Sequence, residues 1–224
     1  GGNYGITVST LKEAEYFAEH GFSDITYAVG IVPSKLDQAA RLQANGADLK
    51  IMTDNERVAR EIATHGAPFR VLIEVDSGDA RAGVQADGED LLAVAGALGA
   101  ARHAQLVGVL THAGHAYGVA TAAEVARIAE DERLSITRSA QRLRDTGHDI
   151  QIVSAGSTPT ALFAENAQGL TEVRAGVYVF FDLDQQSRGV CARDEVALSV
   201  LASVIGHNRT AGKILLDSGG LALS

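Results

Sequence analysis

Short apolar runs alternate with longer segments of helical periodicity along most of the chain. The apolar runs have the length and the β-branched content of strands, and they cover residues 5–8, 24–29, 49–53, 70–76, 106–111, 150–154 and 172–180. The segments between them place apolar residues three or four positions apart, as amphipathic helices do. This order predicts parallel strands covered by helices.

Local signals mark where the helices begin and end. Thr10 and Glu13 have the spacing of a capping box, in which two side chains satisfy backbone amides at a helix start. A glycine follows each of four helical segments just before the next strand, where its access to the left-handed conformation ends the helix. These glycines are Gly21, Gly46, Gly66 and Gly147. The repeating unit is therefore a βα pair.

Seven strands of this kind predict an α/β fold, a (β/α)8 TIM-type barrel without its first βα unit. A closed barrel of this class has eight strands, and the chain opens at what resembles the entry to a strand, so we expect one βα unit upstream of residue 1. The alternative is an open doubly wound sheet, which is disfavoured because no dinucleotide-type glycine fingerprint follows the first strand. We assign residues 1–187 to the barrel.

The pattern changes after Asp182. Residues 197–204 and 213–217 are strand-like, and no helical segment separates them. A hairpin-type turn is expected in between, because this stretch gathers polar residues and a glycine: Asn208, Arg209, Thr210 and Gly212. We assign residues 188–224 to the beginning of a C-terminal β domain, too short to bury a core of its own.

Composition limits the class of protein. Hydrophobic residues make up 46% of the chain and charged residues 21%, as in globular domains. The net charge of −9 opposes binding to nucleic-acid phosphates. The longest apolar stretches, such as residues 196–205, fall short of the roughly 20 residues of a membrane span, and no signal peptide precedes the first strand. With Cys191 as its one cysteine, the chain is expected to be cytoplasmic, with no nucleic-acid or membrane partner.

The clearest candidate chemistry follows the strand at residues 70–76. There the run from Asp76 to Val84, DSGDARAGV, presents one arginine, Arg81, at the strand end where parallel sheets bind ligands. The run resembles the D-x-G-x-x-R-x-G-V signature of fold-type III pyridoxal-phosphate (PLP) enzymes, a group that includes alanine racemase, D-threonine aldolase and eukaryote-type D-serine dehydratase. By this resemblance Arg81 would hydrogen-bond the PLP phenolic oxygen and Asp76 would position the loop. Without it, Arg81 is a solvated loop arginine.

The loop after the seventh barrel strand predicts a phosphate site. Thr158 is expected as the N-cap of a helix and Pro159 as its first residue. Gly156 and Ser157, just after Ser154, would then offer backbone amides and a hydroxyl to a phosphate. TIM barrels often bind phosphate with the loops after strands seven and eight. The alternative is a plain capped helix.

The end of the eighth strand resembles the corresponding strand of the same enzymes. Arg174 would face the pyridine nitrogen of PLP and keep it unprotonated, because a second positive charge beside it is unfavourable. Gly176 and Val177 would offer backbone amides to the phosphate, and Tyr178 is assigned to the same cofactor site. The alternative for Arg174 is an ion pair with Glu172.

The loop after residues 106–111 contains two histidines and a tyrosine in the run THAGHAYG. Such residues could hold a metal or form an aromatic wall, but two ligands without a third are weak evidence for zinc. The run resembles the H-A-G-H-x-Y stretch of D-serine dehydratases. By this resemblance His112 would stack on the PLP ring, while His115 and Tyr117 would line the substrate side as catalytic residues. Two exposed loop histidines are the alternative.

The chain departs from the family pattern in its lysines and in its metal ligands. The family's cofactor lysine is expected upstream of residue 1, and none of Lys12, Lys35, Lys50 and Lys213 matches it. The family's divalent-metal ligands are expected beyond residue 224, and Cys191 is not assigned to them. We therefore expect neither covalent attachment of PLP nor a metal ligand from this chain.

The resemblance implies a PLP-dependent carbon-oxygen or carbon-carbon lyase for D-3-hydroxy amino acids. The reaction would be dehydration of D-serine or D-3-hydroxyaspartate, or retro-aldol cleavage of D-threonine, in a homodimer with Zn or Mn in the full-length protein. The H-A-G-H-A-Y form favours dehydration. An amino-acid racemase and a non-catalytic PLP-binding protein are the alternatives, and the strands after Asp182 disfavour the second.

Overall fold

The computed structural model describes residues 5–219, in two compact units. The chain passes from the first unit to the second between Gly176 and Val177, earlier than the boundary at residue 187 that the sequence suggested. Residues 1–4, where the entry to the first strand was expected, lie outside the described residues. Each unit is described by itself below.

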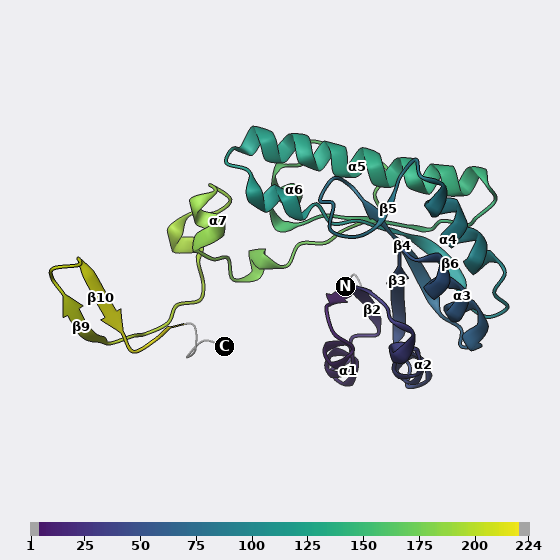
Figure 1. Cartoon of the computed structure of the whole chain (residues 1–224), viewed down its shortest axis with the longest axis horizontal. Helices are drawn as coiled ribbons and strands as arrows, with labels where there is room; N and C mark the ends of the chain where they lie inside the picture. The colour runs from purple at the N-terminus through teal and green to yellow at the C-terminus, as the bar shows by residue number, and fades with distance from the viewer. Residues whose placement is uncertain (1–4, 220–224) are drawn as a thin grey trace. The chain divides into compact units, whose positions relative to one another are not determined.

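The first unit is built on a curved parallel sheet (Figure 1). Seven strands follow one another across it in chain order, without the reversal of order that defines a doubly wound sheet. They pair in parallel from the first to the last, and a short eighth strand, β5, pairs with the end of β4. The strands are β1 Ile6–Val8, β2 Asp24–Gly30, β3 Asp48–Thr53, β4 Arg70–Asp76, β5 Val84–Gln85, β6 Gln105–Leu110, β7 Ile152–Ala155 and β8 Glu172–Val173. The sheet is thus an incomplete TIM-type barrel, as predicted.

Helices connect the strands, and the first of them begins where the sequence signals predicted. Thr10 and Glu13 form the expected capping box, and Thr121 and Glu124 form a second one at the start of the longest helix. Gly66, with a φ of 88°, ends its helix in the left-handed conformation. The helices are α1 Leu11–Glu19, α2 Leu36–Ala44, α3 Glu56–His65, α4 Glu89–Gly99, α5 Ala122–Asp145 and α6 Thr158–Phe163, with 3-10 turns at Pro33–Lys35 and Gly114–Gly118.

Both faces of the sheet are buried, which explains the nearly continuous apolar runs in the sequence. Val71 and Ile73 on β4 belong to the large core cluster that also contains helix residues such as Leu91. Leu72, between them in sequence, faces the other side, where it packs in a smaller cluster with residues of three strands. That inner cluster comprises Met52, Leu72, Val107 and Leu110.

A cluster of charges lies near the amino ends of the strands. Lys50 is buried and forms ion pairs with Asp24 and, at 3.3 Å, with Asp48. The Arg70 guanidinium contacts both carboxylate oxygens of Asp48, at 2.6 and 2.5 Å. Burial raises the pKa of Asp48, but the hydrogen bonds and charges of Arg70 and Lys50 hold it below its ordinary value. Lys50 is therefore committed to a structural ion pair at this end of the sheet.

The second unit contains short helices and one hairpin. Helix α7, Leu183–Ser187, follows a 3-10 turn at Val177–Val179, and a further turn lies at Arg193–Glu195. Strands β9, Val204–Asn208, and β10, Lys213–Leu216, pair antiparallel with Asn208 opposite Lys213, which confirms the predicted hairpin turn.

Two predicted strands were wrong in extent. The strand expected over residues 172–180 ends at Val173, because its partner β7 ends at Ala155 and the ladder stops there. The strand expected over residues 197–204 begins instead at Val204. In the described part of the second unit the preceding stretch has no partner strand, and Leu201 is 100% exposed. Apolar alternation makes a strand only where a neighbour and a surface receive it.

Among residues 5–219, no helix combines the length and the apolar content that crossing a membrane requires.

Gly108 on β6 should be required by the close approach of β6 and β7. A Cβ at this position would lie 2.2 Å from the Ile152 carbonyl oxygen. We expect Gly108→Ala to lower the free energy of unfolding, measured by urea denaturation, by about 2–3 kcal/mol. The control, Gly96→Ala, fills open space at an exposed position of α4 and should raise the free energy of unfolding by roughly 0.5–1 kcal/mol. Equal stability of the two variants would contradict the close approach.

Candidate cofactor-binding site

The candidate site lies at the carboxyl ends of the strands, where loops from β4, β6 and β7 meet the end of β8. Thr111, which directly follows β6, joins these elements. Its hydroxyl donates to the Val75 carbonyl at 2.7 Å and lies 2.9 Å from the Ser77 hydroxyl. Its own carbonyl oxygen accepts a hydrogen bond from Arg174. The ends of β4, β6 and β8 are therefore connected through one fully buried residue, by its hydroxyl and its backbone carbonyl.

Arg174 crosses this end of the sheet. Its guanidinium donates to the Ser154 hydroxyl and to the Thr111 carbonyl, rather than to Glu172 as in the alternative interpretation. Burial lowers the pKa of Arg174, and the negative charges of Glu172, Glu132 and Glu74 oppose that shift. An arginine remains protonated under these conditions because its ordinary pKa is far above neutrality. The site therefore contains one fixed positive charge.

Glu74, on β4, adds a buried carboxyl group to the same region. Burial and then the charge of Asp54 raise the pKa of Glu74, while Arg81 and Arg174 lower it in part. Arg81 and Arg174, both predicted to contact the cofactor, thus favour the charged form of the Glu74 carboxyl group.

The loop after β4 is shaped by Asp76. One carboxylate oxygen accepts from the amides of Gly78 at 2.8 Å and Ala80 at 3.1 Å, and the other accepts from Gln85 at 3.0 Å. Ala80 adopts a φ of 54°, which is uncommon for a residue with a side chain. These contacts confirm that Asp76 positions the loop. The Arg81 side chain is 62% exposed, with its Nε 3.9 Å from Asp79.

The loop after β6 brings His112 against the loop after β7. Nδ1 of His112 lies 3.1 Å from the Gly156 carbonyl oxygen. A carbonyl only accepts hydrogen bonds, so this geometry assigns the proton to Nδ1. The rings of His112 and Tyr117 lie 6.3 Å apart between centroids. The structure therefore holds the predicted stacking ring in one orientation.

His115 lies near the loop after β4 instead of the loop after β7. Its Nδ1 is 4.0 Å from Asp79, in the loop after β4, and has no hydrogen bond. In residues 5–219 there is no group of three or more His, Cys, Asp or Glu side chains placed to hold a metal ion. His112 and His115 thus belong to separate contacts.

The start of α6 differs from the prediction. Ser157, and not Thr158, is the N-cap: its hydroxyl accepts from the Thr160 amide at 3.3 Å, and its own amide donates to the Thr160 hydroxyl at 2.9 Å. A capping box needs a polar partner three residues on, which Ser157 has in Thr160, whereas Thr158 would have Ala161. Pro159 is accordingly the second helical residue and Thr158 the first.

This arrangement changes which groups are free to meet a phosphate. The Gly156 amide donates to Glu132 at 3.0 Å, so it is not available to a ligand. The hydroxyl of Thr158 is buried and has no hydrogen-bond partner, and an amide at the first helical position has no acceptor within its helix. Unpaired buried donors at a helix start suit an anion. The donors present are of the type that a phosphate group needs, but Thr158 is 0% exposed, so its contact with a phosphate stays a prediction.

Gly156 itself is required by conformation. Its φ is 116°, and a Cβ would lie 3.0 Å from both the amide nitrogen and the carbonyl oxygen of Arg174. No residue with a side chain fits between β7 and β8 at this point. Gly156 thus contributes to the site by allowing this close approach.

Glu132, on α5, is the site residue that sequence reasoning missed. It is 3% exposed and accepts hydrogen bonds from two loop amides. A signal existed, because Glu132 occupies the same helical stripe as Ile128, Ala129 and Ile136, all buried. An acidic residue in an apolar stripe indicates a buried polar partner.

Three predicted cofactor residues lie at the junction of the two units. Gly176 ends the first unit, and Val177 and Tyr178 begin the second. Their contact with a cofactor stays a prediction.

Comparison with known proteins identifies the family. The model of the alanine racemase N-terminal domain matches residues 1–184. The chain belongs to this family. The predicted membership among fold-type III PLP enzymes and the predicted fold are both confirmed.

Individual relatives cover the whole chain. D-threo-3-hydroxyaspartate dehydratase from Delftia sp. (strain HT23) is 48% identical over 100% of this chain and 60% of its own length. D-serine dehydratase from Dictyostelium discoideum is 30% identical over 98% and 59%, respectively. The solved Delftia dehydratase structure superposes on this alanine racemase-type domain with a TM-score of 0.94, at 48% identity, over 99% of this chain and 59% of that one. The chain thus spans about 60% of the length of these relatives.

In the described residues of the first unit, no lysine lies at the candidate site. Lys12 pairs with Glu15 on α1, Lys35 donates to the Tyr27 hydroxyl at 3.1 Å, and Lys50 belongs to the charge cluster at the amino ends of the strands. Lys213 lies on β10 in the second unit. The described part of the first unit therefore places no lysine amine at the candidate site.

Two threonines should respond oppositely to the same substitution. Thr158→Val removes a buried hydroxyl without a partner and should raise the free energy of unfolding by about 1 kcal/mol. Thr111→Val removes a buried hydroxyl that donates at 2.7 Å and should lower it by roughly 1–3 kcal/mol. Urea denaturation without ligand measures both. A loss of stability in Thr158→Val would show that its hydroxyl has a partner in the folded protein.

Proposed function

We propose that this chain forms the cofactor-binding barrel of a PLP-dependent lyase that acts on D-3-hydroxy amino acids. The observation that carries the proposal is the convergence of Arg174, His112 and Thr158 on one end of the sheet. These side chains offer a fixed cation, an oriented flat ring and unpaired donors at a helix start. An aromatic phosphate ester with a ring nitrogen needs the same three contacts.

Each group has a distinct task in this proposal. Thr158 donates to the phosphate from its hydroxyl and its amide. The His112 ring stacks on the flat cofactor, and Arg174 faces the pyridine nitrogen and opposes its protonation. Arg81 hydrogen-bonds the phenolic oxygen. When bound, PLP delocalises negative charge from the substrate carbon into its ring.

Other predicted residues act more indirectly. Ser154 holds the Arg174 guanidinium, and Ser157 caps the helix whose first residue meets the phosphate. Gly156 permits the close approach of the strands. Gly176, at the end of the first unit, is proposed to offer its backbone amide to the cofactor, while the roles of Val177 and Tyr178, at the start of the second unit, stay predictions.

The substrate side is proposed to contain His115 and Tyr117 as catalytic residues. Both lie on the 3-10 turn that follows His112, and both are partly buried. We further propose a divalent metal, Zn or Mn, held outside this chain, a homodimer, and a cytoplasmic location.

Dehydration is favoured over carbon–carbon cleavage. The relative with 48% identity is named a dehydratase of D-threo-3-hydroxyaspartate, and the run from His112 to Tyr117 has the form typical of dehydratases. Loss of the α-proton and of the β-hydroxyl would give a 2-keto acid and ammonia after hydrolysis. Retro-aldol cleavage would give glycine and an aldehyde instead.

The proposal is tested on the intact protein that carries this chain. With PLP and Mn²⁺, D-threo-3-hydroxyaspartate or D-serine should yield a 2-keto acid and ammonia, and a chelator should abolish the reaction. Glycine with an aldehyde would indicate an aldolase, and chelator-insensitive loss of optical activity from alanine a racemase. PLP binding without turnover would indicate a non-catalytic protein. Absence of a PLP absorbance change would overturn all of these assignments.

His112→Ala should weaken PLP binding, measured by absorbance titration, by about tenfold. An aromatic stacking contact contributes roughly 0.5–1.5 kcal/mol, and each 1.4 kcal/mol corresponds to a factor of ten. The control is His103→Ala, which removes an exposed histidine just before β6. Equal affinities in the two variants would exclude the stacking role.

A further inference from the structure

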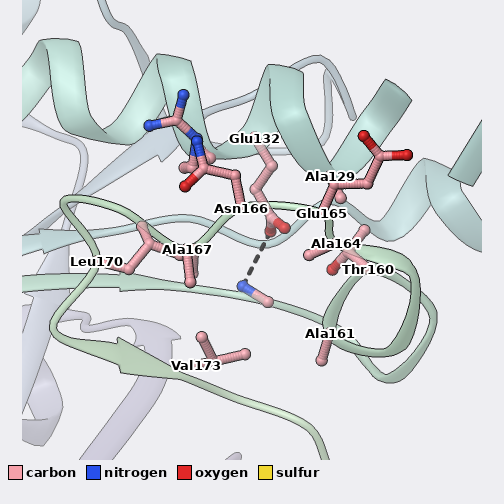
Figure 2. A pocket seen from close by; sticks show the side chains of 13 residues that line it. Ala129, Glu132, Thr160, Ala161, Ala164, Glu165, Asn166, Ala167, Leu170 and Val173 are labelled. Carbon is pink, nitrogen blue, oxygen red and sulfur yellow. Dashed lines mark hydrogen bonds between the residues drawn. The ribbon is translucent and has the colours of Figure 1, made fainter. Parts of the chain in front are cut away.

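Glu132 is an acidic residue buried in the middle of helix α5. One oxygen, Oε1, accepts hydrogen bonds from the amides of Ala113 at 2.9 Å and Gly156 at 3.0 Å. These amides belong to different loops, one after β6 and one after β7. Figure 2 shows the carboxylate pointing from the helix toward the strands, with its bond to Gly156 drawn as a dashed line.

The two amides flank the residues proposed to hold the cofactor. Ala113 directly follows His112, and Gly156 accepts from the His112 ring at 3.1 Å. Gly156 is therefore held on its amide side by Glu132 and on its carbonyl side by His112. It is also followed by Ser157 and Thr158, the start of α6. A single carboxylate thus binds the residue that follows the stacking histidine and the residue that precedes the N-cap of α6.

A carboxylate is not the sole way to give a loop amide a hydrogen-bond acceptor at this place. A cavity of about 270 Å³ lies beside the carboxylate, between α5, α6 and the segment that leads to β8 (Figure 2). This is room enough for water, which could accept from the Gly156 amide, because Gly156 lines the cavity. Burying a carboxylate is costly, so its presence here points to a requirement for fixed geometry.

We propose that Glu132 is a positioning residue of the cofactor site: its Oε1 fixes the loops after β6 and β7 together, so that the His112 ring and the start of α6 are preorganised for PLP. This proposal rests on the proposed function. In this proposal the preorganisation of the loops comes from the position of the acceptor oxygen, within hydrogen-bond distance of both amides, and not from its negative charge. Preorganised loops bind more tightly because less ordering is lost on binding.

Three substitutions of Glu132 distinguish the effect of its side-chain length from the effect of its charge. Glu132→Gln retains the length and an acceptor oxygen but loses the charge. Glu132→Asp retains the charge but is one methylene shorter, and it cannot serve both amides. Glu132→Ala loses both properties. The control is Asp131→Ala, which removes an exposed carboxylate from the adjacent position of the same helix.

The first measurement is amide hydrogen exchange in the absence of cofactor. In Glu132→Ala the amides of Ala113 and Gly156 should both exchange about tenfold faster than in the parent, and in Glu132→Asp at least one of them should, because an amide without its acceptor loses a hydrogen bond worth about 1 kcal/mol. The amide of Val109 within β6 should be unchanged. Glu132→Gln and Asp131→Ala should resemble the parent at all three amides.

The second measurement is PLP affinity of the intact protein by absorbance titration. We expect binding to weaken about tenfold in Glu132→Asp and Glu132→Ala, and by less than about threefold in Glu132→Gln. If Glu132→Ala does not fold, the comparison of Asp with Gln still decides. Parental affinity in Glu132→Asp, or equal losses in Asp and Gln, would overturn the proposal.

The outcomes keep this proposal separate from the proposed function. If the parent does not bind PLP, the proposed function fails, while the exchange rates still report whether Glu132 holds the two loops. If the parent binds PLP and Glu132→Asp binds equally well, the proposed function stands and the positioning role of Glu132 fails.

Discussion

The partly buried guanidinium of Arg174 is the constraint on which the arrangement of the site depends. A charge removed from water must have partners, and Arg174 finds them in the Ser154 hydroxyl and the Thr111 carbonyl. Ser154 lies on β7 and Thr111 directly follows β6, so the guanidinium connects the carboxyl ends of β6, β7 and β8. Gly156 then has to be a glycine, because the backbone of Arg174 occupies the space of a Cβ. The loop geometry around His112 and Thr158 follows from that contact.

The two ends of the sheet have different roles: the amino ends contain structural ion pairs, and the carboxyl ends contain the candidate site. Near the amino ends, Lys50, Arg70 and their aspartates pair with one another, so these charges are satisfied, although Gln43 Oε1 and His65 Nδ1 are buried there without a hydrogen-bond partner. At the carboxyl ends, the Thr158 hydroxyl has no partner and Ala80 is in an uncommon conformation. Unsatisfied and strained groups of this kind concentrate at binding sites, where a ligand compensates them. This division is the usual one for TIM-type barrels.

Sequence patterns predicted the strands well where each strand is buried on both sides. The strand at β4 was predicted over its full extent, Arg70–Asp76, since its apolar run is bounded by charged residues. The prediction failed at β8, where Val173 ends the ladder although the apolar pattern continues. It failed again before β9, where Leu201 has no surface to pack on. Pattern alone does not report where a partner strand stops.

The sequence by itself determined the order of βα units and the cap of the first helix, because these depend on residues within a few positions of one another, and it determined the family through several short motifs along the chain. The capping box of Thr10 and Glu13 is one such case. Tertiary structure alone decided that Glu132 receives the amides of Ala113 and Gly156, and that Thr158 is left unpaired. These contacts join segments far apart in the chain. Their partners are chosen by which strand ends become neighbours in the sheet, and local sequence does not encode that adjacency.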